Sequence, residues 1–100
     1  MKLAQDELEP YLAAVPEWGR EGEWIIRRYG FRTFPESIAF VNRIAVEDEA
    51  SNHHPLIAID YRHVPLRLSS WHAGGLTTAD FDLARHADEL FARMSSWSSD

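Results

Sequence analysis

Residues 56–69 read LIAIDYRHVPLRLS, a segment with two runs in which a large apolar side chain recurs at every second position. A period of two is the pattern of a β-strand that buries one face. The side chains that would share such a face are Ile57, Ile59 and Tyr61 in the first half and Val64, Leu66 and Leu68 in the second. The pattern predicts two strands joined by a tight turn. Because Pro65 has no N–H to donate, its strand should lie at a sheet edge or point that nitrogen away from the pairing.

Two more strands and a helix are predicted before this segment. Residues 24–32, WIIRRYGFR, are rich in aromatic and β-branched side chains and follow a turn over residues 19–22, which indicates a hairpin. Nearer the N-terminus, a short amphipathic helix is expected to end at Pro16. Its apolar residues recur at roughly helical spacing and are Leu3, Leu8, Leu12 and Val15.

Two further helices are predicted on either side of residues 56–69. Thr33 and Glu36 fit a capping box with Pro35 in the first turn, so a helix should run from about Phe34 to Ala50. Its expected buried face consists of Phe34, Ile38, Val41 and Ala45. The residues 77–80, Thr-Thr-Ala-Asp, open a third helix. Its apolar stripe is Phe81, Ala84, Ala87, Leu90, Phe91 and Met94.

The order of these elements, α-β-β-α-β-β-α, favours an α+β fold in which an antiparallel four-stranded sheet carries helices on one face. A chain of 100 residues with 45% hydrophobic side chains can close one core, so residues 1–100 are expected to form a single domain. A domain of this size buries a modest fraction of its surface, and pairing with copies of itself would add stability.

Composition excludes several classes of function. The net charge of −6 arises from 16 acidic and 10 basic side chains without a run of Lys or Arg, which argues against direct binding to nucleic acid. The absence of cysteine excludes a disulfide framework and a thiolate metal site. Acidic residues interrupt the N-terminus before any apolar run, so neither a signal peptide nor a membrane anchor is expected. We therefore expect a cytoplasmic protein.

The segment Glu49–Pro55, EASNHHP, carries the clearest chemical signal. His53 and His54 are adjacent and are followed by a proline, so two imidazoles, which titrate near neutrality, are fixed at one place. Histidines in surface loops are often without function. The pair alone does not decide between a functional site and two solvent-exposed side chains. A zinc site needs three or four ligands, and adjacent histidines lack the helical spacing of known metal motifs, so no metal is expected.

Three other residues are candidates for the same site. Glu49 lies near the predicted helix end, where an acid opposes the helix dipole, and it can orient an imidazole; the alternative is a solvated acid. Trp71 falls on the pleat face opposite the buried residues of its strand, so it should present its indole to a cavity unless it packs in a core or interface. Asp80 has a structural explanation in the capping box with Thr77.

The spacing of these residues resembles the signature of the pterin-4a-carbinolamine dehydratases. The matching pattern is Glu49-x3-His53-His54-Pro55-x5-Tyr61-x9-Trp71-x8-Asp80, together with Gly74-Gly75-Leu76-Thr77. Further matches are Arg28-x2-Phe31-x2-Phe34, Ala39-Phe40, Leu76-Thr77-x2-Asp80-Phe81 and Leu83-Ala84. The resemblance extends from about Trp18 to Leu90 and therefore covers most of the chain.

The resemblance implies a fold, a reaction and an assembly. Such proteins are α+β dimers or tetramers that remove water from a 4a-hydroxytetrahydropterin, a by-product of aromatic amino-acid hydroxylation, and give a quinonoid dihydropterin without metal or organic cofactor. It implies that His53 acts as the acid on the departing hydroxyl and that His54 helps to hold the pterin. Glu49, Trp71 and Asp80 are then expected to contribute to substrate binding.

The chain departs from this pattern at Trp71. Many members carry a further histidine there, which serves as another acid, whereas an indole has no proton that titrates near neutrality. His72 is a candidate substitute, and unequal handling of the two hydroxyl stereoisomers is the alternative. The departure also keeps two other functions open, a dimerisation or assembly scaffold without catalysis and a pterin-binding protein of another pathway.

Overall fold

The computed structural model describes residues 1–98 and the side chains of residues 1–94. The predicted order of elements is confirmed, with one short 3-10 helix, η1, added after the last strand. The elements are α1 (Gln5–Ala14), β1 (Gly19–Glu21), β2 (Trp24–Gly30), α2 (Phe34–Ser51), β3 (Leu56–Ile57), β4 (His63–Leu68), η1 (Trp71–Ala73) and α3 (Thr78–Ser98).

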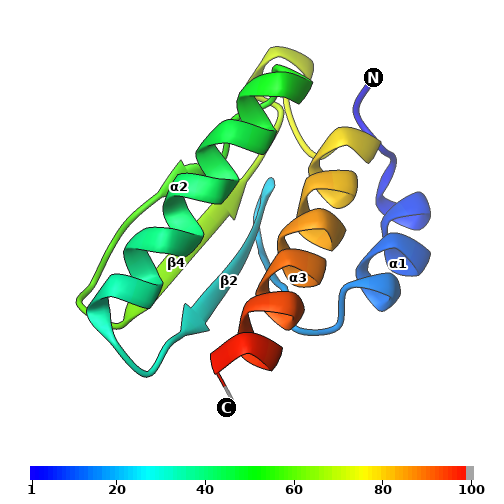
Figure 1. Cartoon of the computed structure of the whole chain (residues 1–100). Coiled ribbons are helices and arrows are strands. Elements are labelled where there is room, and N and C mark those ends of the chain that lie inside the picture. The colour runs from blue at the N-terminus through cyan, green and yellow to red at the C-terminus, as the bar shows by residue number, and fades with distance from the viewer. Residues whose placement is uncertain (99–100) are drawn as a thin grey trace.

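The four strands form one antiparallel sheet in the order β1-β2-β4-β3. Figure 1 shows α2 and α3 lying across the same face of this sheet, with α1 on the far side of α3. The predicted α+β class is therefore confirmed, including the helices on one face. None of the helices within residues 1–98 is long and apolar enough to cross a membrane.

Pro65 lies in a central strand and not at an edge, because β4 is paired on both sides. The Ala58 N–H donates to the Pro65 carbonyl oxygen at 3.1 Å, but Pro65 has no N–H to return toward Ala58. The nitrogen therefore points away from the pairing with β2, as in the second predicted alternative, but it faces the β3 side, where it ends the ladder. The strand expected over residues 56–61 was too long: β3 ends at Ile57, where the proline interrupts the ladder.

The buried face of α2 differs from the predicted one by a rotation about the helix axis. Phe34 is exposed, and the buried positions are Ser37, Phe40, Ile44 and Asp48. The prediction holds for Val41, which is partly buried against the core, and is wrong for Phe34 and Ala45, which are exposed. Two polar residues occupy the buried face, so the apolar pattern indicated a neighbouring one. The stripe predicted for α3 does face the core, which it joins through Phe81, Ala84, Ala87 and Leu90.

A hydrogen-bond cluster around Asp88 ties α3 to β2. Oδ1 of Asp88 accepts from Trp18 Nε1 at 3.0 Å, Arg27 Nη1 at 2.8 Å and Tyr29 Oη at 2.5 Å. Burial raises the pKa of the Tyr29 hydroxyl, and the hydrogen bond to Asp88 raises it further. Tyr29 therefore serves here as a donor that holds the helix against the sheet.

Candidate active site

The C-terminus of α2 turns the chain toward the two adjacent histidines. Asn52 adopts the left-handed conformation, with φ 56° and ψ 36°. Its N–H donates to the Glu49 carbonyl at 3.1 Å, and the His53 N–H donates to the Asp48 carbonyl at 3.3 Å. This is the Schellman pattern of helix ends, and asparagine tolerates the left-handed region better than most residues. The cap therefore sets where His53 begins.

His53 is held by a carboxylate that is wholly buried. Its Nε2 lies 2.7 Å from Oδ1 of Asp80, whose side chain is 0% exposed. The other carboxylate oxygen of Asp80 accepts from the Thr77 N–H at 2.9 Å and from the Ser70 hydroxyl at 2.8 Å. Asp80 therefore caps the first turn of α3 through the Thr77 N–H, which is one half of the predicted capping box, and also holds an imidazole. The Thr77 hydroxyl lies 2.8 Å from the Ser70 hydroxyl.

His54 has an exposed carboxylate partner. Its Nε2 lies 2.8 Å from Oε1 of Glu49, and the two side chains are 56% and 79% exposed. Glu49 thus contacts an imidazole, as the sequence suggested, and the ring is that of His54. Because both groups are well solvated, this pair contributes orientation rather than much stability.

A small cavity lies between the loop after α2 and the segment that joins β4 to η1. Its volume is about 150 Å³, and its lining residues are Asn52, His53, His54, Ser69, Ser70, Trp71 and His72. The Trp71 ring stacks on the His72 ring, with centroids 4.0 Å apart and planes at 27°. One wall therefore carries two imidazoles and the other carries an indole and a third imidazole.

The five predicted site residues lie close together and form two groups. His53, His54 and Trp71 line the cavity, whereas Glu49 and Asp80 each stand behind one histidine. Trp71 leaves the core, as predicted, but it does so in η1 and not through the alternation of a strand.

Some residues of the site and its surroundings were not found by sequence reasoning. Ser70 was missed as a donor to Asp80, because a lone serine after a strand carries no signal. Tyr61 lies outside the site: it is exposed in the β3–β4 turn with φ 55° and stacks on Phe34. Among the described residues, no three His, Cys, Asp or Glu side chains converge as a metal site would require.

Asp48 is a second buried carboxyl group close to this region. It is 5% exposed on the inner face of α2. Burial raises its pKa to about 6, and the Glu47 carboxylate also raises it, while His86, His53 and His54 act in the opposite direction. His86 itself pairs with Glu47 at 2.7 Å. Asp48 therefore lies between the site histidines and the contact of α2 with α3.

Comparison with curated proteins finds close relatives along nearly the whole chain. A protein from Picosynechococcus sp., named "Putative pterin-4-alpha-carbinolamine dehydratase", is 43% identical over 89 residues, which are 89% of this chain and 97% of the relative. A protein of the same name from Thermomicrobium roseum is 46% identical over 89 residues, which are 89% of this chain and 96% of the relative.

Two solved structures share the fold. A Brucella melitensis protein described as a transcriptional coactivator/pterin dehydratase superposes with a TM-score of 0.85 at 26% identity, over 90% of this chain and 98% of its own. A pterin dehydratase-like protein identified as a RuBisCO assembly factor in the alpha-carboxysome gives 0.65 at 23% identity, over 75% and 89%, and it supports the fold alone. The family model described as pterin 4 alpha carbinolamine dehydratase matches residues 1–90. The chain therefore belongs to the pterin-4-alpha-carbinolamine dehydratase family.

Proposed function

We propose that this protein dehydrates 4a-hydroxytetrahydrobiopterin to quinonoid dihydropterin and water, and so recycles pterin for aromatic amino-acid hydroxylation. Family membership supports the class of substrate. The observation that carries the proposal is His53, which lines the cavity while the buried Asp80 holds its Nε2 at 2.7 Å. A carboxylate that fixes an imidazole in this way is a recurring device of acid–base catalysis.

In the proposed reaction His53 is the general acid. An ionised carboxylate only accepts hydrogen bonds, so Asp80 keeps a proton on Nε2, and Nδ1 is the nitrogen that acts on the substrate. The C4a–O bond breaks with both electrons on oxygen, which takes the Nδ1 proton and leaves as water. The N5 lone pair forms the C4a–N5 double bond, and N5 then releases its own proton. A positioned acid typically contributes about 10² to 10⁴ in rate.

The second proton-transfer group of the proposed site is His72. It lines the cavity from η1, whereas His53 lines it from the loop after α2. In the proposed reaction the His72 imidazole takes the proton that N5 releases. It also supplies a titratable group next to Trp71, whose indole cannot serve in that role.

Substrate binding is assigned to the remaining cavity residues. The exposed Trp71 indole offers a flat face on which a planar pterin can stack. His54 and Glu49 are placed to address the polar edge of the ring. The cavity of about 150 Å³ is smaller than the roughly 300 Å³ or more that is usual for enclosed ligands, so the substituent at C6 should project into solvent.

The runner-up function is a non-catalytic scaffold of the same fold. The observation that favours it is the indole of Trp71 at a cavity wall where the family commonly has an acid. We further expect a cytoplasmic protein that assembles into dimers or tetramers. Size-exclusion chromatography with light scattering tests the assembly, and a monomer would contradict it.

The deciding experiment is a stopped-flow assay of 4a-hydroxytetrahydrobiopterin dehydration against the spontaneous rate. The wild type should accelerate the reaction, and His53→Ala should lose the acceleration while His63→Ala, at the opposite end of β4, keeps it. If the well-folded wild type gives no acceleration, dehydration is not its function and the scaffold becomes the better proposal. Equal activity of the wild type and His53→Ala would instead refute the assignment of the acid.

A further inference from the structure

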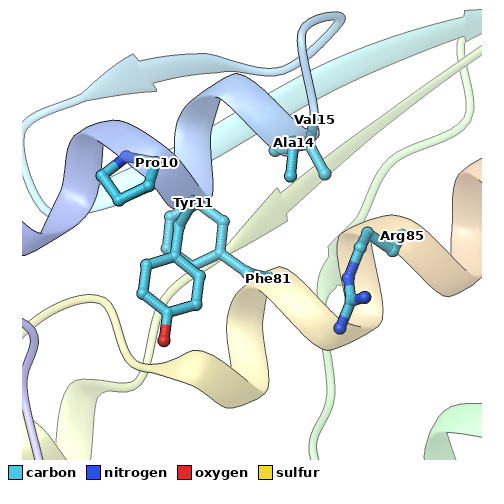
Figure 2. A pocket seen from close by; sticks show the side chains of 6 residues that line it. All are labelled: Pro10, Tyr11, Ala14, Val15, Phe81 and Arg85. Carbon is cyan, nitrogen blue, oxygen red and sulfur yellow. The ribbon is translucent and has the colours of Figure 1, made fainter.

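A second and larger cavity lies between α1 and α3, apart from the histidines. Its volume is about 410 Å³, within the range of about 300 to 1,000 Å³ that is typical of small-molecule sites. It is lined by Pro10, Tyr11, Ala14, Val15, Phe81 and Arg85, which Figure 2 shows from close by. None of these residues has a part in the proposed dehydration. We call this cavity the α1–α3 groove.

The groove lies along the contact of α1 with α3, beside the packed rings of Tyr11 and Phe81. Pro10 lies inside α1 and removes one of its intrahelical hydrogen bonds, so the helix is weakened at this point. Ala14 has too short a side chain to reach across to α3. Leu8 is the one residue of α1 that is buried. The α1 side of the groove is therefore formed largely by exposed or partly exposed side chains, Pro10, Tyr11 and Ala14.

The inner walls of the groove are apolar and in part aromatic. Phe81 and Val15 are 2% and 0% exposed, and the rings of Tyr11 and Phe81 lie with their centroids 5.3 Å apart and their planes at 34°. Of the two rings Tyr11 is the partly exposed one, so a flat apolar group would leave water to lie mainly against the Tyr11 ring, which Phe81 supports from below. Such burial contributes about 25 cal/mol for each Å² of apolar area.

Two polar groups stand at the mouth of the groove. In Figure 2 the Tyr11 hydroxyl and the Arg85 guanidinium both point away from α1. Arg85 pairs with Asp82 along the same helix, and both side chains are more than half exposed, so this contact costs little to give up. A guanidinium has five N–H donors in a fork that matches a carboxylate. The mouth therefore favours an anionic end group.

We propose that the α1–α3 groove is a binding site for a small organic carboxylate with a flat apolar body, of the aryl-alkanoate kind. The apolar body lies against the Tyr11 ring and its neighbours Pro10 and Ala14, and the carboxylate reaches Arg85. Phe81 directly follows Asp80 in α3, so the occupant would contact the helix turn that holds His53.

The test titrates the full chain with 3-phenylpropionate and with the uncharged 3-phenylpropanamide. Isothermal titration calorimetry gives the dissociation constants, and ¹H–¹⁵N spectra locate the site. The carboxylate should bind about tenfold more tightly than the amide, as expected for one charge-assisted hydrogen-bonded contact at a partly exposed site. The amide signals that move should be those of residues 10–15 and 81–85.

Matched variants separate the groove from the rest of the surface. Arg85→Gln should remove the preference for the carboxylate, and Ala14→Leu should weaken both probes by filling the groove. The controls are Arg93→Gln, also an exposed arginine of α3, and Ala13→Leu, an exposed neighbour that does not line the groove; both should bind as the wild type does. Equal affinity for the two probes, shifts elsewhere, or an unchanged Ala14→Leu variant would overturn the proposal, and none of these results bears on dehydration.

Discussion

Nε2 of His53 lies 2.7 Å from Oδ1 of Asp80, although 27 positions separate the two residues in the chain. This contact joins the loop that follows α2 to the first turn of α3. Because Asp80 is 0% exposed, it acts on the cavity through the two lining groups that it holds, the His53 imidazole and the Ser70 hydroxyl. Asp80 is therefore a positioning residue in the proposed site rather than a direct contact of the substrate.

Asp80→Asn should impair the reaction and the stability of the fold together. The amide can donate to His53 and so favours the other tautomer, which removes the proton from the nitrogen that Asp80 now holds. We expect a fall of about 100-fold in kcat and a loss of about 2 kcal/mol in the free energy of unfolding. The measurements are dehydration rates, urea unfolding and the ¹⁵N shifts of the His53 ring.

The control for this variant is Asp82→Asn, an exposed position in the same turn of α3. It should leave all three measurements within error of the wild type. If the Asp80→Asn protein is less stable but keeps the wild-type His53 tautomer and kcat, Asp80 acts only as a helix cap.

Trp71→Ala should weaken substrate binding without affecting folding. The side chain is 77% exposed, so its removal should change the free energy of unfolding by less than about 0.5 kcal/mol. Loss of a stacking surface should raise KM roughly tenfold, and Trp71→Phe should recover part of it. Steady-state kinetics and thermal unfolding provide the readout, and an unchanged KM would exclude stacking on this indole.

His72→Gln should change the pH dependence of the reaction. If His72 takes the N5 proton, its removal should lower kcat about 100-fold and abolish one of the two limbs of the pH–rate profile. His53→Gln should remove the other limb. A profile of unchanged shape in His72→Gln, together with an active wild type, would remove His72 from the mechanism and leave the role of His53 intact.

Asp48→Asn should stabilise the protein, and more so at higher pH. Burial raises the pKa of Asp48 from 3.8 to about 6, so the folded chain binds this proton more tightly than the unfolded chain. The stability that the protonated acid provides is full below pH 4 and is lost as the pH rises through 6. The variant should therefore exceed the wild type by roughly 2 kcal/mol at pH 7.5 and by little at pH 4. Urea unfolding across this range tests it, and a constant difference would contradict it.

Asp88→Asn should destabilise the contact between β2 and α3. One carboxylate oxygen accepts three hydrogen bonds, and the Arg27 and Asp88 side chains are 19% and 26% exposed. Removing the charge should cost roughly 2 kcal/mol in the free energy of unfolding. Glu89→Gln, an exposed neighbour, should cost nothing measurable. Equal stability of the two variants would show that the cluster contributes little.

The sequence predicted the order and type of the seven main elements, and periodicity did so where apolar residues repeat, as in α3 and β4. For β1 it predicted the hairpin but assigned residues 19–22 to the turn, because this strand, Gly-Arg-Glu, has no apolar residue to reveal it. Periodicity failed in part for α2, where Ser37 and Asp48 occupy buried positions, and for β3, whose length depends on the missing N–H of its partner Pro65.

Motif spacing indicated which residues lie near one another around His53 and His54, although it also included Tyr61, which lies elsewhere, and the roles of the site residues stay predictions. It could not show that Asp80 pairs with His53, since a contact over 27 positions depends on how α3 packs against the end of α2.

The left-handed Asn52 also restricts which sequences can carry this loop. A backbone at φ 56° accepts glycine readily, asparagine and aspartate less so, and β-branched residues at a clear energetic cost. In a saturation library scored for dehydration, position 52 should therefore admit only a few residues, although its own side chain has no assigned chemical step. Selection at this position would act on the direction of the backbone. A residue can therefore be essential for activity because of its backbone conformation, even though its side chain takes part in no proposed chemical step.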